Sequence, residues 1–178
     1  MTNAPIGAII KVQKRKELIT MMNNLPAMIC FDMDGTIADL YGVENWLPML
    51  REFDPTPYEV AEPMWQMAEL AEVLNLLRAV GVEIRIITWL SKDSNPQYDA
   101  EVREAKRNWL AEQNFPFDHF HGVQYGATKA DSIRRYLPNG ETAILIDDNA
   151  KVRNGWHMGE AIDPTACDIV EVLRNLLN

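Results

Sequence analysis

The chain has 178 residues, and its 17 lysines and arginines against 26 aspartates and glutamates leave a formal net charge of −9. This length fits one domain whose core is large enough to fold without disulfides, and a hydrophobic fraction of 47% is ordinary for a globular protein. No apolar run approaches the roughly 18 residues of a membrane span, and the negative charge argues against an extended nucleic-acid-binding face.

The N-terminal region carries charge of the opposite sign. Residues 11–16 include four basic side chains, and we expect 1–25 to form a basic tail ahead of a core domain at 26–178. The apolar piece at 6–10 is too short for a signal peptide. Two distant cysteines, Cys30 and Cys167, make neither a disulfide framework nor a zinc site. We therefore predict a cytoplasmic protein in which Cys30, inside an apolar run, is a buried thiol.

Short apolar runs then alternate with helical patterns along the chain. We predict strands at 27–31, 82–87 and 142–146, with weaker candidates at 120–124 and 160–162. Apolar residues recur at three- and four-residue spacing within 67–80, 102–110, 133–137 and 169–176, which predicts helices there. This alternation indicates an α/β fold: a doubly wound, Rossmann-like three-layer domain with a mainly parallel five-stranded sheet.

One segment interrupts the alternation. Between the first strand and its crossover helix lie residues 37–64, which contain four of the prolines. Structureless loops of this length are uncommon inside a compact domain and are usually functional. We expect a small, mostly helical lid inserted after the first strand.

Acidic residues follow two of the predicted buried strands. Asp32 and Asp34 come after the first, and Asp147 and Asp148 come after the run at 142–146, while Thr88 follows the run at 82–87. Reactive groups in such sheets lie beyond the carboxyl ends of the strands, so these side chains should converge at one edge. Neighbouring carboxylates need a counter-charge, and an oxygen-only ligand set favours Mg²⁺.

The local pattern is more specific than an acidic cluster. Asp32-Met33-Asp34-Gly35-Thr36 follows a buried strand, Thr88 closes the second, Lys129 lies 18 residues before Asp147, and Asp147-Asp148 follows the third. In this order the motifs resemble those of the haloacid dehalogenase superfamily of phosphohydrolases, over residues 27 to about 150. A receiver domain also combines acids, a threonine and a lysine, but its acidic pair ends the first strand, which disfavours that interpretation.

The resemblance implies roles for the acids. Asp32 would attack phosphorus and form an aspartyl-phosphate, and Asp34 would protonate the leaving oxygen and then deprotonate water. Asp32, the backbone carbonyl of Asp34 and Asp148 would bind the metal. Asp147 would be a further ligand or an outer-shell acid, and Asn149 a hydrogen-bond partner of the ligands.

Three residues would bind the phosphate. Thr88 would donate through its hydroxyl and Trp89 through its backbone N–H, and Lys129 would add a positive charge. Thr128 followed by Asp131 predicts a capping box that places Lys129 in the first helical turn.

The expected substrate is a small phosphate ester. The segment inserted after the first strand has room for a small lid but not for a large cap domain, so the site would be relatively open. An open site fits nucleotides, sugar phosphates or a polynucleotide end. Resemblance to the 5'(3')-deoxyribonucleotidase branch in 104–110 and 147–153 favours a (deoxy)nucleoside monophosphate, with Tyr41, Trp46 or Trp65 available to stack on a base. A phosphomutase shares the motifs, and a non-catalytic phosphate-binding module is the alternative from another class.

Other polar and aromatic residues receive structural interpretations. Within the helical pattern at 102–110 we expect Lys106 to be an exposed charge and Trp109 a core aromatic. His119 and His121 share a face if extended, but without a third ligand we expect them to be solvent-exposed on an edge strand.

Overall fold

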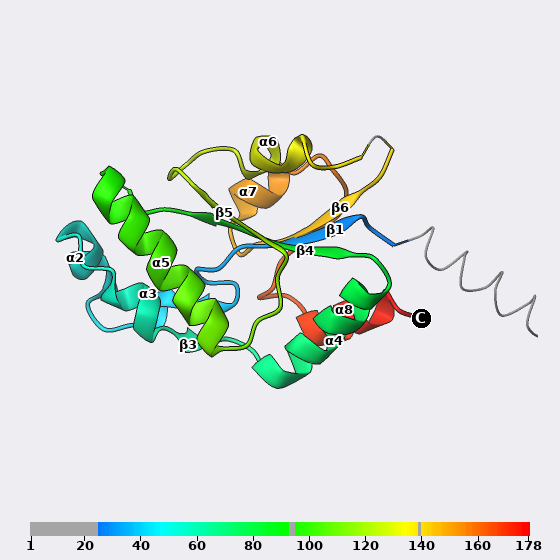
Figure 1. Ribbon diagram of the computed structural model, residues 1–178, viewed down its shortest axis with the longest axis horizontal. Helices are drawn as coiled ribbons and strands as arrows, with labels where there is room; N and C mark the ends of the chain where they lie inside the picture. The colour runs from blue at the N-terminus through cyan, green and yellow to red at the C-terminus, as the bar shows by residue number, and fades with distance from the viewer. Residues whose placement is uncertain (1–24, 93–94, 139) are drawn as a thin grey trace, which may run out of the picture.

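A five-stranded parallel sheet runs through the centre of the molecule (Figure 1). The computed structural model describes residues 25–92, 95–138 and 140–178, so the predicted basic tail lies almost wholly outside the described residues. The sheet has the order β5-β4-β1-β6-β7, with every neighbouring pair parallel. Its strands are β1 (Met28–Phe31), β4 (Glu83–Trp89), β5 (His119–Val123), β6 (Ala143–Ile146) and β7 (Ala161–Ile162). All five predicted strands are present, and the predicted doubly wound fold is confirmed.

Helices cover both faces of this sheet. Figure 1 shows α6 and α7 on one side and α4, α5 and α8 on the other. Their bounds are α4 (Met67–Ala79), α5 (Pro96–Glu112), α6 (Lys129–Arg134), α7 (Ala150–Asn154) and α8 (Ile169–Asn175). Among the described residues, none of the helices has the length and apolar composition needed to cross a membrane.

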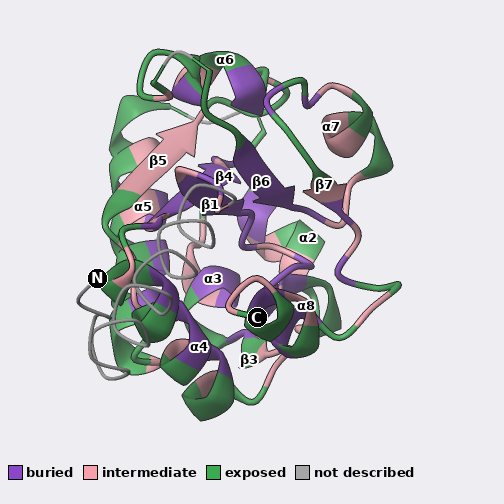
Figure 2. Ribbon diagram, turned by 90° about the vertical axis from the view of Figure 1, so that its right-hand side faces the viewer, coloured by how far each residue is buried: buried purple, intermediate pink, exposed green. Residues whose placement is uncertain are grey.

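The alternation of side chains along β1 divides the interior into two cores. Ile29 and Phe31 pack with α4 and α8, whereas Met28 and Cys30 pack with α6 on the opposite face. Both faces of the strand are therefore buried, which explains its continuous apolar run (Figure 2). Cys30 is buried as predicted, and burial raises the pKa of its thiol to about 12.

The two histidines of the edge strand β5 differ in how far they are exposed. His119 is exposed, as predicted, but His121 is half-buried, and its Nε2 lies 3.2 Å from Nη1 of Arg85. The prediction that both are solvent-exposed is therefore wrong for His121, because Arg85 and Tyr136 pack against it.

The segment expected to form a lid lies beyond the carboxyl ends of the strands (Figure 1). It contains β2 (Ala38–Asp39), η1 (Leu40–Gly42), α2 (Trp46–Arg51), α3 (Thr56–Val60) and β3 (Glu62–Pro63). β2 and β3 pair antiparallel and close its base. Tyr98 of α5 donates a hydrogen bond to the carbonyl of Asp54, and its ring packs edge-on against Phe53. These contacts dock the segment, hereafter the lid, against α5.

The burial of α4 gives a direct test of the larger core. Leu74 has no exposed surface, whereas Leu76, on the same helix, is 50% exposed. Leu74→Ala should lower the free energy of unfolding by about 2–5 kcal/mol through cavity formation, and Leu76→Ala by less than about 1 kcal/mol. Urea denaturation measures both. Equal effects would contradict this orientation of the helix.

Candidate active site

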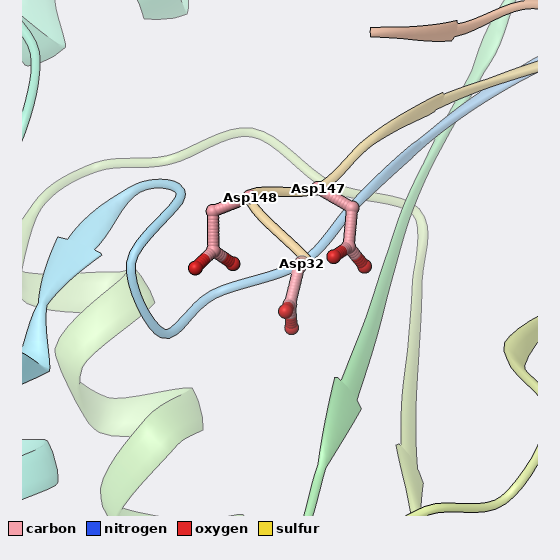
Figure 3. A group of neighbouring side chains, drawn as sticks. All are labelled: Asp32, Asp147 and Asp148. Atoms are coloured by element: carbon pink, nitrogen blue, oxygen red, sulfur yellow. The ribbon is translucent and has the colours of Figure 1, made fainter. Parts of the chain in front are cut away.

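Three carboxylates meet at the carboxyl edge of the sheet. Asp32 follows β1, and Asp147 and Asp148 follow β6, the strand paired with β1 in parallel register. Each offers an oxygen atom, and these atoms lie within 4.8 Å of one another. Figure 3 shows the three side chains beyond the ends of the two strands, with their carboxylates pointing in roughly the same direction. The predicted convergence of these three acids follows directly from the strand pairing.

A buried ammonium group holds two of these acids. Nζ of Lys129, the first residue of α6, lies 2.7 Å from Oδ2 of Asp32 and 2.7 Å from Oδ2 of Asp147. Burial alone would lower the pKa of Lys129, but the two carboxylates raise it above its usual value. Thr128 is the N-cap of α6, but its side chain makes no capping hydrogen bond, so the predicted capping box is wrong. Packing and charge position Lys129 instead.

The remaining charge at this edge is suited to a divalent cation. Three carboxylates and one ammonium sum to −3 + 1 = −2. Burial, and after it the charge of Asp32, raises the pKa values of Asp147 and Asp148 to about 6, so ionisation of all three acids is costly. The three acids can hold a metal ion, and the oxygen-only donor set fits a hard cation.

The backbone around the acidic pair is firmly braced. Arg153 donates from Nη1 to the carbonyls of Asp147 (2.8 Å) and Asp148 (2.6 Å) and pairs with Asp163. The backbone N–H of Asn149 donates to Oδ1 of Asp147, while its side chain caps α7 instead of contacting the acids. The expected partner role of Asn149 therefore falls to its main chain. The sequence motifs assigned no role to Arg153, although it lies only five residues after Asp148.

Asp34 belongs to a second charged group. Its Oδ2 accepts a 2.6 Å hydrogen bond from Nζ of Lys106, which also donates to Oγ1 of Thr88 at 2.7 Å and to the carbonyl of Trp89 at 3.0 Å. Burial raises the pKa of Asp34, and Lys106 opposes that rise. The side chain of Asp34 thus lies outside the three-acid group.

The prediction that Lys106 is an exposed charge is wrong, because the residue has no exposed surface. It lies on the buried stripe of α5, four residues after Val102 and three before Trp109, which is a core aromatic as predicted. That spacing is the signal that could have identified it. The ring of Tyr58, 4.6 Å from its Nζ, completes its surroundings.

Trp89 links the two charged groups. Its carbonyl accepts from Lys106, and the centroid of its ring lies 5.2 Å from Nζ of Lys129. The indole N–H donates to the carbonyl of Ala127, which fixes the ring. Thr88 and Trp89 end β4, which pairs with β1 on the side opposite β6. The strand order therefore brings all the predicted site residues to one edge.

A cavity of about 290 Å³ opens over this edge. Asp32, Asp34 and Asp148 form its floor, and the lid supplies most of the rest. Its aromatic and basic lining residues are Tyr41, Trp46, Arg51, Phe53, Tyr58, Trp89, Lys92 and Tyr125. Of the three aromatics expected to stack on a substrate, Tyr41 and Trp46 line the cavity. Trp65 does not, because its indole N–H donates to the carbonyl of Thr36 at the base of the lid.

The glycine of the first motif is required by close packing. Gly35 has φ +75°, and a Cβ there would lie 2.6 Å from the ring of Tyr41 and 2.8 Å from a carboxylate oxygen of Asp148. Any side chain would strain the turn and displace Asp148 or the lid.

Comparison with known proteins supports the fold. No protein-family model and no curated protein sequence matches the chain. A chain of the solved Pnkp1/Rnl/Hen1 RNA repair complex superposes with a TM-score of 0.51 and 16% sequence identity, covering 78% of the present chain. The match spans 42% of that longer chain. At this identity the likeness establishes a shared α/β fold alone.

The raised carboxylate pKa values predict how metal binding depends on pH. Protons compete with Mg²⁺ for Asp147 and Asp148, whose pKa values are about 6, so the Mg²⁺-induced rise in melting temperature should grow between about pH 5 and about pH 7. Without metal, these groups bind protons more tightly folded than unfolded. Their contribution to stability should therefore fall as the pH rises from about 4 to about 6.

The variant Asp148→Asn tests whether the three acids bind Mg²⁺. Removing one of the three negative charges should raise the metal-free melting temperature at pH 7 by about 2–4 °C and abolish most of the Mg²⁺ shift. Glu72→Gln, at an exposed position of α4, is the control and should change neither value. Differential scanning fluorimetry measures both, and an undiminished Mg²⁺ shift in Asp148→Asn would contradict the metal site.

Proposed function

We propose that this protein is a Mg²⁺-dependent phosphomonoester hydrolase of the haloacid dehalogenase superfamily, close to its 5'(3')-deoxyribonucleotidase-like branch, acting on nucleotides. The observation that carries the proposal is the separation of the two acids of the first motif. Asp32 lies with the metal-competent acids and Lys129, whereas Asp34 lies with Lys106 and Thr88. This separation supports the assignment of attack on phosphorus to Asp32 and of proton transfer to Asp34.

The metal, held by Asp32, Asp148 and the carbonyl of Asp34, with Asp147 as a ligand or outer-shell acid, would neutralise charge on the phosphate and on its attacker. Asp32 attacks phosphorus, and the bond from phosphorus to the ester oxygen breaks as an aspartyl-phosphate forms. Asp34, whose pKa burial raises, donates its proton to the departing oxygen. It then takes a proton from the water that hydrolyses the aspartyl-phosphate, which regenerates both acids.

The phosphate itself needs hydrogen-bond donors. Two of the three protons of Lys129 point to Asp32 and Asp147, which leaves the third for a phosphate oxygen. The Thr88 hydroxyl accepts from Lys106, and its Oγ1 lies 3.4 Å from the carbonyl oxygen of Trp89, a long hydrogen bond that leaves its proton available for a better acceptor. The backbone N–H of Trp89 is the third proposed donor.

The walls of the cavity favour a substrate with a planar apolar group. Tyr41 and Trp46 pack edge-on 5.2 Å apart in the lid, and Tyr58 and Trp89 line the same space. A nucleobase can stack on such rings, whereas a sugar phosphate would leave them in contact with water. Arg51 and Lys92 add positive charge at the lining. A nucleoside monophosphate matches this combination of acids, cations and rings.

The division of labour between the acids predicts different responses to the leaving group. Asp32→Asn should abolish phosphate release from every ester. Asp34→Asn should lower the single-turnover rate of ester cleavage about 10²–10⁴-fold for a deoxynucleoside monophosphate, whose alkoxide needs a proton, but much less for p-nitrophenyl phosphate, whose phenolate does not. Hydrolysis of the aspartyl-phosphate, which is common to both esters, should slow equally for both. Colorimetric phosphate assays with Mg²⁺ measure phosphate release, and rapid-quench measurement of the released alcohol or phenol gives the cleavage rate.

Other outcomes separate the alternatives. Equal losses in the cleavage rates of the two esters would contradict the acid role of Asp34. Equal kcat/KM on sugar phosphates and deoxynucleotides would contradict the nucleotide preference. Transfer within a bisphosphorylated sugar without release would indicate a phosphomutase, and phosphate binding without any turnover would indicate a binding module.

Lys106 should act by positioning Asp34 and Thr88. Lys106→Met should lower the single-turnover cleavage rate of a deoxynucleoside monophosphate at least about tenfold because Asp34 loses its only charged donor in the described structure. The loss of cleavage rate should be smaller for p-nitrophenyl phosphate, and Glu104→Gln, at an exposed position of α5, should leave both rates unchanged. Equal losses in the cleavage rates of the two esters in Lys106→Met would indicate general destabilisation instead.

A further inference from the structure

A second hollow, of about 450 Å³, lies along the edge strand β5 between α5 and α6. Residues 120–123 line it, together with two arginines of α5 and Arg135, which directly follows α6. We call it the arginine groove and define it by Arg103, Arg107 and Arg135 together with that stretch of β5. No residue of the proposed active site lines it.

The groove concentrates positive charge on a protein whose formal net charge is −9. Arg103, Arg107 and Arg135 make no ion pair with any residue of the described segments, whereas Asp131, the acid at its side, pairs with Arg134. Nη1 of Arg103 is buried and has no hydrogen-bond partner in the described structure. An unpaired buried donor is costly, so an anion in the groove would satisfy both its charge and its hydrogen bond.

The contacts of the arginines and the pKa of His121 also indicate a positive electrostatic potential in the groove. The guanidinium of Arg107 lies 4.8 Å from the centroid of the Phe120 ring, and Arg135 stacks on Tyr136 at 4.7 Å. Burial, and after it the positive charges of Arg85 and its neighbours, lowers the pKa of His121 to about 4. His121 is thus a neutral group within a cationic surface at neutral pH.

The groove and the catalytic cavity adjoin along the chain. Val123 lines the groove, and Tyr125, two residues later, lines the cavity. Gly122 of the groove is paired with Thr88, on the neighbouring strand about 5 Å away. Tyr125 is 55% exposed and packs 5.1 Å from Trp89, and Tyr136 is 39% exposed. A chain leaving the cavity over Tyr125 would enter the groove directly.

We propose that the arginine groove binds the phosphodiester backbone of a single-stranded nucleic acid whose terminal phosphate monoester is hydrolysed in the catalytic cavity. The last step rests on the proposed function, but the binding does not. The three arginines without acidic partners supply positive charge for phosphodiester groups, and the exposed ring of Tyr125 offers a surface on which an unpaired base stacks. The overall negative charge does not oppose this, because exposed charges beyond about 10 Å are screened.

Binding is tested first, without catalysis. The probe is a fluorescent single-stranded DNA of about eight nucleotides without a terminal phosphate, followed by anisotropy. Arg107→Gln/Arg135→Gln should raise its Kd about tenfold and reduce the slope of log Kd against log salt by about 1.4, or about 0.7 per lost phosphate contact. The single variant Arg135→Gln has a matched control, Arg174→Gln, which replaces an exposed arginine of α8. The control should bind the DNA as the unaltered protein does.

Catalysis is tested second, with 5′- and 3′-phosphorylated forms of the same DNA and with the matching nucleoside monophosphates. The double variant should raise KM about tenfold for the phosphorylated DNA and leave kcat and KM for the mononucleotide unchanged. Unaltered Kd and KM in the double variant would overturn the groove proposal while leaving the hydrolase proposal intact.

The remaining outcomes are also decisive. Groove-dependent DNA binding without hydrolysis of any ester would support the groove and contradict the proposed function. Inorganic polyphosphate of similar length competing as well as the DNA would overturn the nucleic-acid assignment in favour of a simple polyanion. A double-stranded form binding more tightly than the single strand would overturn the stacking argument.

Discussion

The neutralisation of buried carboxylates by two buried lysines constrains the whole carboxyl edge of the sheet. Lys129 reaches Asp32 and Asp147 from α6 on one face, and Lys106 reaches Asp34 from α5 on the other. A buried charge without a partner costs several kcal/mol, so neither helix can shift without exposing an uncompensated acid. The two acids of the first motif are thereby drawn into different electrostatic environments, although a single residue separates them in sequence. That difference in environment underlies the proposed division between nucleophile and proton donor.

The strand order is what makes this arrangement possible. β1 lies between β4 and β6, so the residues that follow it face Thr88 and Trp89 on one side and Asp147 and Asp148 on the other. The order of the strands changes direction here, and crossover helices diverge to opposite faces, which leaves a crevice. The lid covers that crevice and packs on α5, the helix that carries Lys106. The cavity under the lid and the positioning of Asp34 therefore share one supporting helix.

Charge on this protein must be considered locally. The net charge of −9 is a property of the whole sequence, yet the groove beside β5 gathers three arginines that lack acidic partners among the described residues. The acidic edge formed by Asp32, Asp147, Asp148 and Lys129 has a local charge of the opposite sign, −2 before any metal binds. Screening over about 10 Å lets two such regions coexist on neighbouring edges of one sheet. The net charge therefore bears on the solubility of the protein, but it does not predict what binds in the arginine groove or at the acidic edge.

Local pattern in the sequence was sufficient for the strands, for most of the helices and for the residues that follow each strand, because apolar periodicity and strand-end polarity are short-range properties. Through the rules of parallel sheets it placed Asp32, Asp34, Thr88, Asp147 and Asp148 at one edge, and the family resemblance added Lys129. The tertiary structure decided what depends on neighbours distant in sequence. Lys106 looks like a solvated charge until Asp34 and Thr88, 72 and 18 residues away, supply its partners. His121 and Trp65 were misjudged for the same reason, since their surroundings come from other elements. A side chain's role is set by its partners, and only the folded chain brings those partners together.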